Sequence, residues 1–435
     1  MRYRKLRFVA YAVPTTPARL SFIGARNGPG SLVGCYAAKP DFDSDVATRI
    51  RILEAAVDAS EDYLHRLPRE DDVLTIFMAP EFFFHGPAGP YLYRPGEEDP
   101  ADVVTDRLLR AFPAERYRHR LFVFGSILSA CIASPRRLFA ESDATVRNAM
   151  ARDLATAWLS AEGPIKTSIF DMLTNFVKIS RGQSRVEVRN RALVLQTTAK
   201  ENGDVQPLAM RSDKYFVSNA DFLLFDAGGR TDVITETMTS YPRVDLSTGD
   251  WKQAPFDHYA KFAVGADPPI AMGLEICVDH VDRRLRRYGA DVNETGRHPV
   301  LNVQLVPSCG MQILADSVAV APGGYVFNCD GQYDLDDTRS RPAAGTQGKI
   351  ACLYANYVCE QSPLHAAHSQ LCRVAAPAEE VQGARTASDG ISFDHLDPAN
   401  MAVLPVEAGD DLKDCFAGGA GELHVYGVKR PYPIP

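Results

Sequence analysis

The sequence has neither an excess of basic residues nor a long hydrophobic run. Its 435 residues include 47 Lys and Arg against 55 Asp and Glu, which gives a formal net charge of −8 at pH 7. Proteins that bind nucleic acid usually carry a basic excess, so we expect no nucleic-acid partner. No stretch approaches the ~18 uninterrupted apolar residues of a membrane-spanning helix, so we expect no membrane partner either.

The sequence also lacks the cysteine framework that disulfide-rich proteins have. Its nine cysteines are odd in number and scattered, a pattern typical of reduced thiols in a cytoplasm. The basic start Met1–Arg7 is followed by the short apolar run Phe8–Val13, without the small-residue cleavage site of a signal peptide. We therefore interpret residues 8–13 as a first strand and expect a soluble, cytoplasmic protein.

Close Cys-x2-Cys pairs, which mark structural zinc sites, are missing too. One cluster of potential ligands comprises Cys352, Cys359, His365, His368 and Cys372. A strand followed by histidines at helical spacing explains this cluster without a metal, and zinc is the weaker alternative. We therefore expect no metal site.

Strand and helix patterns alternate through the first three quarters of the chain, which predicts an α/β fold built around a sheet. Apolar residues recur at helical spacing between Val46 and Leu64, which indicates an amphipathic helix. The other predicted strands are short apolar runs at residues 73–79, 121–128, 191–195, 221–225, 301–306, 325–327, 350–354 and 423–428.

Three segments have the character of additions to a compact core. Residues 84–100 are rich in Pro and Gly, residues 138–180 have helical character, and residues 373–422 are rich in Ala, Gly, Asp and Glu. Surface loops of this kind are usually simple decoration, although binding residues often lie on them. We interpret them as a surface loop, a helical insertion and a mobile or partner-wrapping extension, respectively, with simple loop decoration as the favoured alternative for all three.

The stretch Pro269–His280 predicts a strand that ends beside a thiol. Its apolar residues Ile270, Met272, Leu274 and Ile276 alternate with Ala271, Gly273, Glu275 and Cys277, which places the two sets on opposite faces. Apolar residues at helical spacing follow the strand, and the arginines 283, 284, 286 and 287 between them indicate a solvated helix face. A thiol at the end of such a strand would be accessible to a substrate at the sheet edge, although a buried strand cysteine is the commoner case.

A nucleophilic thiol needs a base that takes its proton and a donor that holds the oxyanion. His280 lies three positions after Cys277 and is one possible base. Glu81 is the alternative, because it follows an apolar strand and lies among Pro80 and three Phe residues. Partial desolvation in such surroundings makes a carboxylate a stronger base.

Three segments resemble the nitrilase, or carbon–nitrogen hydrolase, superfamily, and they occur in the family's order of Glu, Lys and Cys. They are Ala79–Phe83 (APEFF), Asn190–Leu195 (NRALVL) leading to Met210–Tyr215 (MRSDKY), and Gly273–Asp279 (GLEICVD). The resemblance covers about residues 6–335. Each motif is short, but three in the correct order on matching strands form a specific combination.

The resemblance implies a catalytic triad in which Glu81 is the general base and acid, Lys214 stabilises the tetrahedral intermediate and Cys277 is the nucleophile. The backbone N–H of Val278 resembles the family's second oxyanion donor. Thiolate attack on an amide or nitrile carbon would give a thioester, which water activated by Glu81 hydrolyses, with no metal or organic cofactor. The candidate substrate contacts are Phe83, Asp279, His280 and Ser308.

The chain departs from the family pattern near the second triad member and after the third. Lys200 competes with Lys214 for the role of the lysine, and Asp221 is a candidate for the second carboxylate that many members carry. Val278 occupies a position where the family commonly has an aromatic residue. A small amide is favoured over a nitrile as the substrate, because amidases are abundant in the family.

The family's fold is a four-layer α-β-β-α sandwich that commonly pairs with a second copy. The resemblance therefore implies a hydrolase domain over residues 1–340 with an insertion at about 131–185. Residues 341–435 would form C-terminal strands and an extension that packs on a partner subunit of a homodimer or larger homo-oligomer. Two alternatives remain open: transfer of the acyl group to an amine, and a non-catalytic binding or scaffold protein of the same fold.

Overall fold

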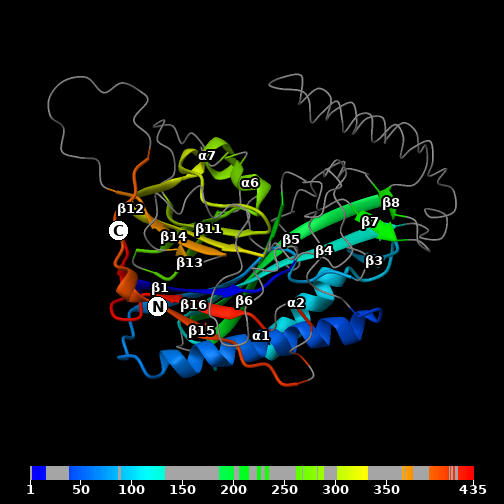
Figure 1. The fold of residues 1–435 in the computed structure, drawn as a ribbon, viewed down its shortest axis with the longest axis horizontal. Coiled ribbons are helices and arrows are strands. Elements are labelled where there is room, and N and C mark those ends of the chain that lie inside the picture. The colour runs from blue at the N-terminus through cyan, green and yellow to red at the C-terminus, as the bar shows by residue number, and fades with distance from the viewer. Residues whose placement is uncertain are drawn as a thin grey trace, which may run out of the picture.

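The computed structural model describes the chain in segments. These are residues 2–15, 39–86, 90–132, 186–199, 205–214, 223–226, 231–234, 261–266, 268–281, 283–288, 301–331, 365–366, 368–375, 391–410, 412, 415–416 and 420–435. The segments form a mixed α/β fold with two large sheets and few helices (Figure 1). Several predictions lie outside them: the 138–180 helices, the 350–354 strand, Lys200, Asp221, Cys352, Cys359 and the boundary at residue 340.

The first sheet contains both the N-terminal and the C-terminal strands. Its order is β15 (Met401–Pro405), β16 (Glu422–Tyr426), β1 (Lys5–Ala12), β2 (Val73–Ala79), β4 (Arg120–Ile132), β5 (Val186–Ala199) and β6 (Val205–Asp213). β17 (Tyr432–Pro433) pairs with β1, and β3 (Tyr91–Tyr93) pairs with β4. The three strands β1, β2 and β4 are parallel to one another.

The second sheet carries the predicted nucleophile strand, β10 (Ile270–Leu274), next to one edge. Its order is β13 (His365–Ala366), β14 (Ser369–Arg373), β12 (Val320–Asp330), β11 (Leu301–Ser308), β10 (Ile270–Leu274) and β9 (Lys261–Val264), with β10, β11 and β12 parallel. A separate hairpin pairs β7 (Leu223–Asp226) with β8 (Thr231–Ile234). Because β16 pairs with β1 and β14 pairs with β12, the C-terminal strands complete both sheets of their own chain.

Side chains from both sheets share one hydrophobic core, which we call the inter-sheet core. On β1, Phe8 and Ala10 point into it, and the ring of Phe8 lies 5.1 Å from that of Phe327 on β12, centroid to centroid. Val9 and Tyr11 alternate with them and pack instead against α1 (Phe42–Leu64). Each fully buried side chain of this size contributes roughly 2–3 kcal/mol. The sheets are therefore joined face to face, with α1 and α2 (Pro100–Ala111) beside the first sheet (Figure 1).

The predicted amphipathic helix is confirmed as α1, which begins four residues before Val46. The Asp41 carboxylate caps it by accepting a hydrogen bond from the Ser44 N–H at 2.8 Å. Val46, Leu53 and Val57 are fully buried on its inner face, as the spacing predicts. The helix therefore packs against the outer side of β1 and β2.

The strand pattern around Cys277 is confirmed in part. Ile270, Met272, Leu274 and Ile276 all lie in the inter-sheet core, as the alternation predicts. Cys277 also contacts this core, whereas the alternation predicted the opposite face. The reason is that β10 ends at Leu274, so the period of two does not continue to Cys277.

Two other local predictions need correction. The helix predicted after Cys277 is broken into α6 (Val278–Val281) and α7 (Arg284–Tyr288), with Arg283 at φ +61° between them. The segment 84–100 does not begin as a surface loop, because Phe84 and His85 are fully buried and β3 lies within it. The remaining short helices among the described residues are the 3-10 turns η3 (Ala315–Ser317) and η4 (Pro398–Asn400).

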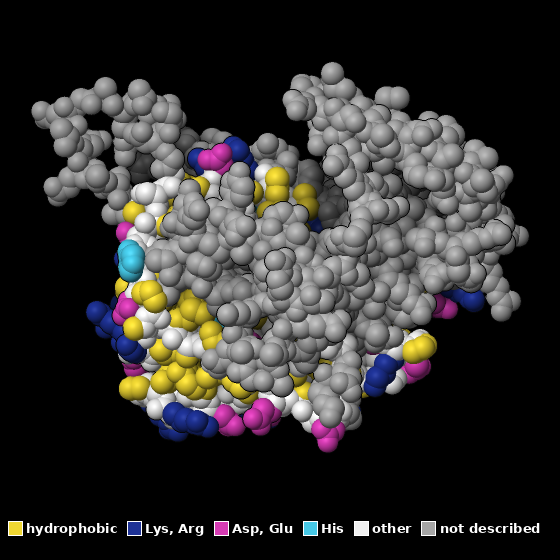
Figure 2. All heavy atoms as spheres, viewed as in Figure 1, with side chains coloured by type: hydrophobic (Ala, Val, Ile, Leu, Met, Phe, Trp, Pro, Cys, Tyr) yellow, Lys and Arg dark blue, Asp and Glu magenta, His cyan; other side chains and the backbone are white. Residues whose placement is uncertain are grey.

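The described surface has mixed charge. On the face drawn in Figure 2, Lys and Arg side chains lie beside Asp and Glu side chains along the rim of the molecule. Among the residues described, no helix combines the length and the apolar character that crossing a membrane requires.

Candidate functional site

Glu81 lies in a tight turn that follows β2. Its N–H donates to the Ser308 carbonyl at 3.3 Å, and its own carbonyl accepts from Thr15 Oγ1 at 2.5 Å. The next residue, Phe82, has φ +58°, a left-handed conformation that is uncommon for a residue with a large side chain. Gly125 allows the close approach of this turn, because a Cβ there would lie 2.1 Å from the Pro80 carbonyl oxygen.

The Glu81 carboxylate forms a buried ion pair with Lys214. Lys214 Nζ lies 2.8 Å from Glu81 Oε1, and Asn190 Nδ2 donates to the same oxygen at 2.7 Å. Glu81, Lys214 and Asn190 are at most 3% exposed. The Lys214 ammonium also lies 5.7 Å from the centroid of the Phe82 ring. The structure thus brings together the carboxylate and the lysine that the sequence predicted.

Cys277 lies in the turn between β10 and α6. Its backbone has φ +50°, its N–H donates to the Pro307 carbonyl at 3.1 Å, and its Sγ lies 3.7 Å from the Cys309 carbonyl oxygen. The residue is 5% exposed. Non-glycine residues with positive φ carry strain and are concentrated at functional sites.

The end of β11 connects the two halves of the site. The Cys277 N–H bonds the Pro307 carbonyl and the Glu81 N–H bonds the carbonyl of the adjacent Ser308. The turn that carries the thiol and the turn that carries the carboxylate are therefore anchored one residue apart. This point lies at the carboxyl ends of the parallel strands β10 and β11, where α/β sheets commonly bind ligands.

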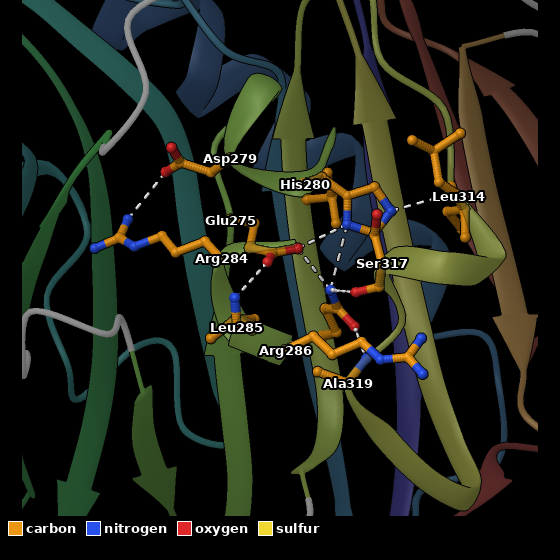
Figure 3. Close-up of polar contacts among 12 residues, drawn as sticks. Glu275, Asp279, His280, Arg284, Leu285, Arg286, Leu314, Ser317 and Ala319 are labelled. Atoms are coloured by element: carbon orange, nitrogen blue, oxygen red, sulfur yellow. Dashed lines mark hydrogen bonds and ion pairs between the residues drawn. The ribbon is translucent and has the colours of Figure 1, made fainter. Parts of the chain in front are cut away.

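The His280 side chain, which we predicted as a substrate contact, belongs to a buried polar network, while its backbone N–H bonds the Cys277 carbonyl at 2.8 Å. Its Nδ1 lies 2.6 Å from Glu275 Oε2, and its Nε2 accepts a hydrogen bond from the Leu314 N–H at 3.0 Å (Figure 3). This pattern assigns a neutral imidazole with the proton on Nδ1. Because both nitrogens are engaged and the ring is fully buried, His280 is not placed to act as the base.

Glu275 is the centre of that network. Its carboxylate accepts hydrogen bonds from His280, from Gln304 Nε2 at 2.6 Å and from the Leu285 N–H at 2.7 Å. Gln304 in turn accepts from the Ala319 N–H at 2.8 Å (Figure 3). The network ties the end of β10 to β11, α6 and α7, and so fixes the turn that contains Cys277.

The other predicted substrate contacts have protein partners as well. Ser308 Oγ lies 3.0 Å from the Met311 carbonyl and accepts from Asn328 Nδ2 at 2.9 Å. The Phe83 ring packs 6.0 Å from that of Phe416, in the core beneath α1, and so points away from Lys214. Phe82 is the aromatic residue beside the lysine. Val278, whose N–H is the predicted oxyanion donor, is the first residue of α6.

Asp279 and Arg284 form a second buried ion pair beside the site. Arg284 Nη1 lies 2.9 Å from Asp279 Oδ2 and is 3% exposed as a residue, so the prediction of a solvated arginine face is wrong at this position. The neighbouring Arg283 is solvated, with 45% of its side chain exposed. Sequence reasoning missed the roles of Arg284, Phe82 and Asn190, although Asn190 is the first residue of one of the three motifs.

A buried arginine from α1 holds the loop that follows Glu81. Arg49 donates to the Phe83 carbonyl and, at 2.7 Å, to the His85 carbonyl, while its Nε lies 2.8 Å from Asp45 Oδ2. Burial alone would raise the pKa of Asp45. The Arg49 charge and the hydrogen bonds from Tyr91 and the Lys39 N–H outweigh it and leave that pKa below 3.8.

We expect the folded protein to lose stability in mild acid because of His85. Burial, with a smaller effect of the Arg49 charge, lowers the pKa of His85 from 6.5 to about 3. Between these values the unfolded chain binds a proton that the folded chain does not, so stability is retained above pH 6.5 and falls as the pH decreases. The contribution is about 1.4 kcal/mol per pH unit. Asp45 adds a loss only below pH 3.8.

Urea unfolding at pH 7, 6, 5 and 4 measures this effect against a His85→Asn variant. The Asn side-chain amide can replace the donor that bonds the Gly86 carbonyl at 2.8 Å. The free energy of unfolding should fall more steeply with decreasing pH in the wild type than in the variant. If the free energy of unfolding depends on pH in the same way in both proteins, His85 is not the cause of the loss of stability in acid.

Potential metal ligands do not cluster in the described part of the chain. No three His, Cys, Asp or Glu side chains there are grouped as for a metal ion. Of the sequence cluster considered above, Cys372 lies on β14 and is buried in the core on the outer side of the second sheet.

Comparison with protein-family models, with curated proteins and with solved structures finds no match for this chain.

Proposed function

We propose that the protein is a thiol-dependent hydrolase of a non-peptide carbon–nitrogen bond, with a small amide as the favoured substrate. The observation that carries the proposal is the buried Glu81–Lys214 ion pair, whose carboxylate turn is anchored beside the Cys277 turn. The backbone N–H groups of Glu81 and Cys277 bond adjacent carbonyls at the end of β11. A carboxylate and an ammonium are costly to bury, which makes their position beside a thiol turn informative. Two sheets packed face to face, with helices on the outer side of the first, support the family's four-layer sandwich.

The proposed cycle uses Glu81 as a proton carrier. Glu81 takes the proton of the Cys277 thiol as the sulphur attacks the amide carbon, and the Lys214 ammonium and the Val278 N–H stabilise the oxyanion. The carbon–nitrogen bond then breaks, the amine leaves with the proton from Glu81, and a thioester remains. Water gives a proton to Glu81 and attacks the thioester, which releases the acid and returns the proton to the thiol.

Selective alkylation separates an enzyme from a non-catalytic scaffold. Iodoacetamide should modify Cys277 at neutral pH far faster than Cys329, because burial raises the pKa of the Cys329 thiol well above its ordinary value. Peptide mapping after brief labelling identifies the modified residue. Cys329 is thus a control within the same chain, and equally slow labelling of both cysteines would contradict a nucleophilic role for Cys277.

Product analysis separates hydrolysis from acyl transfer. A panel of small amides and nitriles is incubated with the protein, and ammonia release is compared between the wild type and a Cys277→Ala variant. Added hydroxylamine competes with water for the thioester and yields a hydroxamate. We expect acid as the main product when no amine is added. Product formation only in the presence of an amine acceptor would instead indicate a transferase.

A further inference from the structure

The guanidinium of Arg284 joins the two chain segments that carry the lysine and the thiol. Its Nη1 lies 2.9 Å from Asp279 Oδ2 and donates to the Asp213 carbonyl, also at 2.9 Å. Asp279 comes two residues after Cys277, and Asp213 immediately precedes Lys214. Figure 3 shows the Arg284 side chain extending from α7 toward the Asp279 carboxylate.

The Lys214 backbone is held on two sides. Its N–H donates to the Asn190 carbonyl at 2.8 Å, which attaches it to β5 of the first sheet. The contact from Arg284 to Asp213 attaches the same segment to the second sheet, through the helix that follows the thiol. Both Arg284 and Asp279 are buried, with side chains 4% and 0% exposed, so solvent does not weaken the contact.

We propose that Arg284 is a positioning residue, which fixes the Lys214 ammonium relative to the Cys277 sulphur by bonding Asp213 and Asp279 together. This inference rests on the proposed function, in which the ammonium favours the thiolate and the oxyanion. Arginine suits the role because the planar guanidinium fixes the directions of the N–H bonds of Nη1, which makes both contacts, whereas the lysine ammonium rotates on a flexible stem. Displacement of a catalytic group by about 1 Å can cost ~100-fold in rate.

The test is the pH dependence of Cys277 alkylation by iodoacetamide in the full-length protein. In Arg284→Ala, we expect the pH of half-maximal alkylation to rise by about one pH unit. The alkylation rate at neutral pH should fall correspondingly, by about tenfold. Arg284→Lys keeps the charge but cannot hold both acceptors in the same geometry. It should recover most of the thermal stability while its alkylation profile stays between those of the wild type and Arg284→Ala.

Two control variants separate positioning from general loss of stability. Arg120→Ala removes an arginine whose ion pair with Glu61 is also largely buried, 16% and 14% exposed, between α1 and β4. Arg283→Ala removes the exposed neighbour that pairs with Asp316. Both should leave the alkylation profile of Cys277 unchanged, even where Arg120→Ala lowers the melting temperature.

The outcomes distinguish this inference from the proposed function. A selectively reactive wild-type Cys277 whose profile is the same in both Arg284 variants would overturn the positioning role alone. A wild-type Cys277 that reacts no faster than Cys329 would overturn the proposed function, and the positioning role with it. If Arg284→Ala does not fold, an Arg284→Lys profile identical to that of the wild type overturns the positioning role.

Discussion

Lys214→Met is expected to destabilise the protein by about 3–5 kcal/mol, because the Glu81 carboxylate is then buried without its counter-charge. Glu81→Gln should cost a similar amount, since the Lys214 ammonium is left in the same position. The double variant Glu81→Gln/Lys214→Met should recover much of the loss, because buried ion pairs can be replaced by uncharged groups at little cost. Urea unfolding of the four proteins at pH 7 gives the coupling free energy.

Activity should not follow stability in this series. All three variants lack a group that the proposed cycle requires, so the double variant should be stable and still inactive. Asp58→Asn/Arg116→Met is the matched control, because that ion pair is 49% and 59% exposed and exposed pairs contribute about 0–1 kcal/mol. If the single Lys214→Met variant is as stable as this control, the Glu81 carboxylate does not depend on Lys214 as a buried counter-charge.

Glu275→Gln is expected to destabilise the protein by about 2–4 kcal/mol and to slow alkylation of Cys277. The carboxylate accepts hydrogen bonds from His280, Gln304 and the Leu285 N–H. In the Gln variant, the side-chain NH2 group replaces one acceptor oxygen and faces one or more of these donors, so at least one hydrogen bond is lost. His280 cannot compensate by moving its proton to Nε2, because that nitrogen faces the Leu314 N–H.

Thermal unfolding and the alkylation rate at pH 7 measure the two effects. Asp316→Asn is the control, because its carboxylate is 75% exposed and borders the same region through Arg283. We expect the control to differ from the wild type by less than about 0.5 kcal/mol. A stable Glu275→Gln protein with unchanged Cys277 reactivity would show that the network does not hold the thiol turn.

Elements with a regular period could be predicted from the sequence. The alternation from Ile270 to Ile276 predicts which side chains enter the inter-sheet core, and the helical spacing after Val46 predicts α1. The resemblance of the three motifs implied that Glu81, Lys214 and Cys277 share one site, and the structure pairs Glu81 with Lys214. The two periodic predictions succeed because the pattern of burial repeats along neighbouring residues.

The predictions that failed concern contacts and backbone angles that no regular sequence period encodes. Arg283 and Arg284 are adjacent, but Arg284 is the one that bonds the Asp279 carboxylate and the Asp213 carbonyl, 71 residues away. The positive φ of Phe82 breaks the alternation, so the sequence could not show that Phe82, and not Phe83, lies beside the lysine. His280 likewise belongs to a network that includes Gln304 and Leu314, which lie 24 and 34 residues further along the chain.

Formation of an acyl-enzyme on Cys277 tests the central claim most directly. The protein is mixed with p-nitrophenyl acetate, an activated acyl donor, quenched in acid and analysed by intact mass and peptide mapping. We predict one acetyl group, attached to Cys277, in the wild type and none at that position in Cys277→Ala or in the stable Glu81→Gln/Lys214→Met variant. Acetylation spread over surface lysines, with an unmodified Cys277 in the wild type, would contradict the proposal.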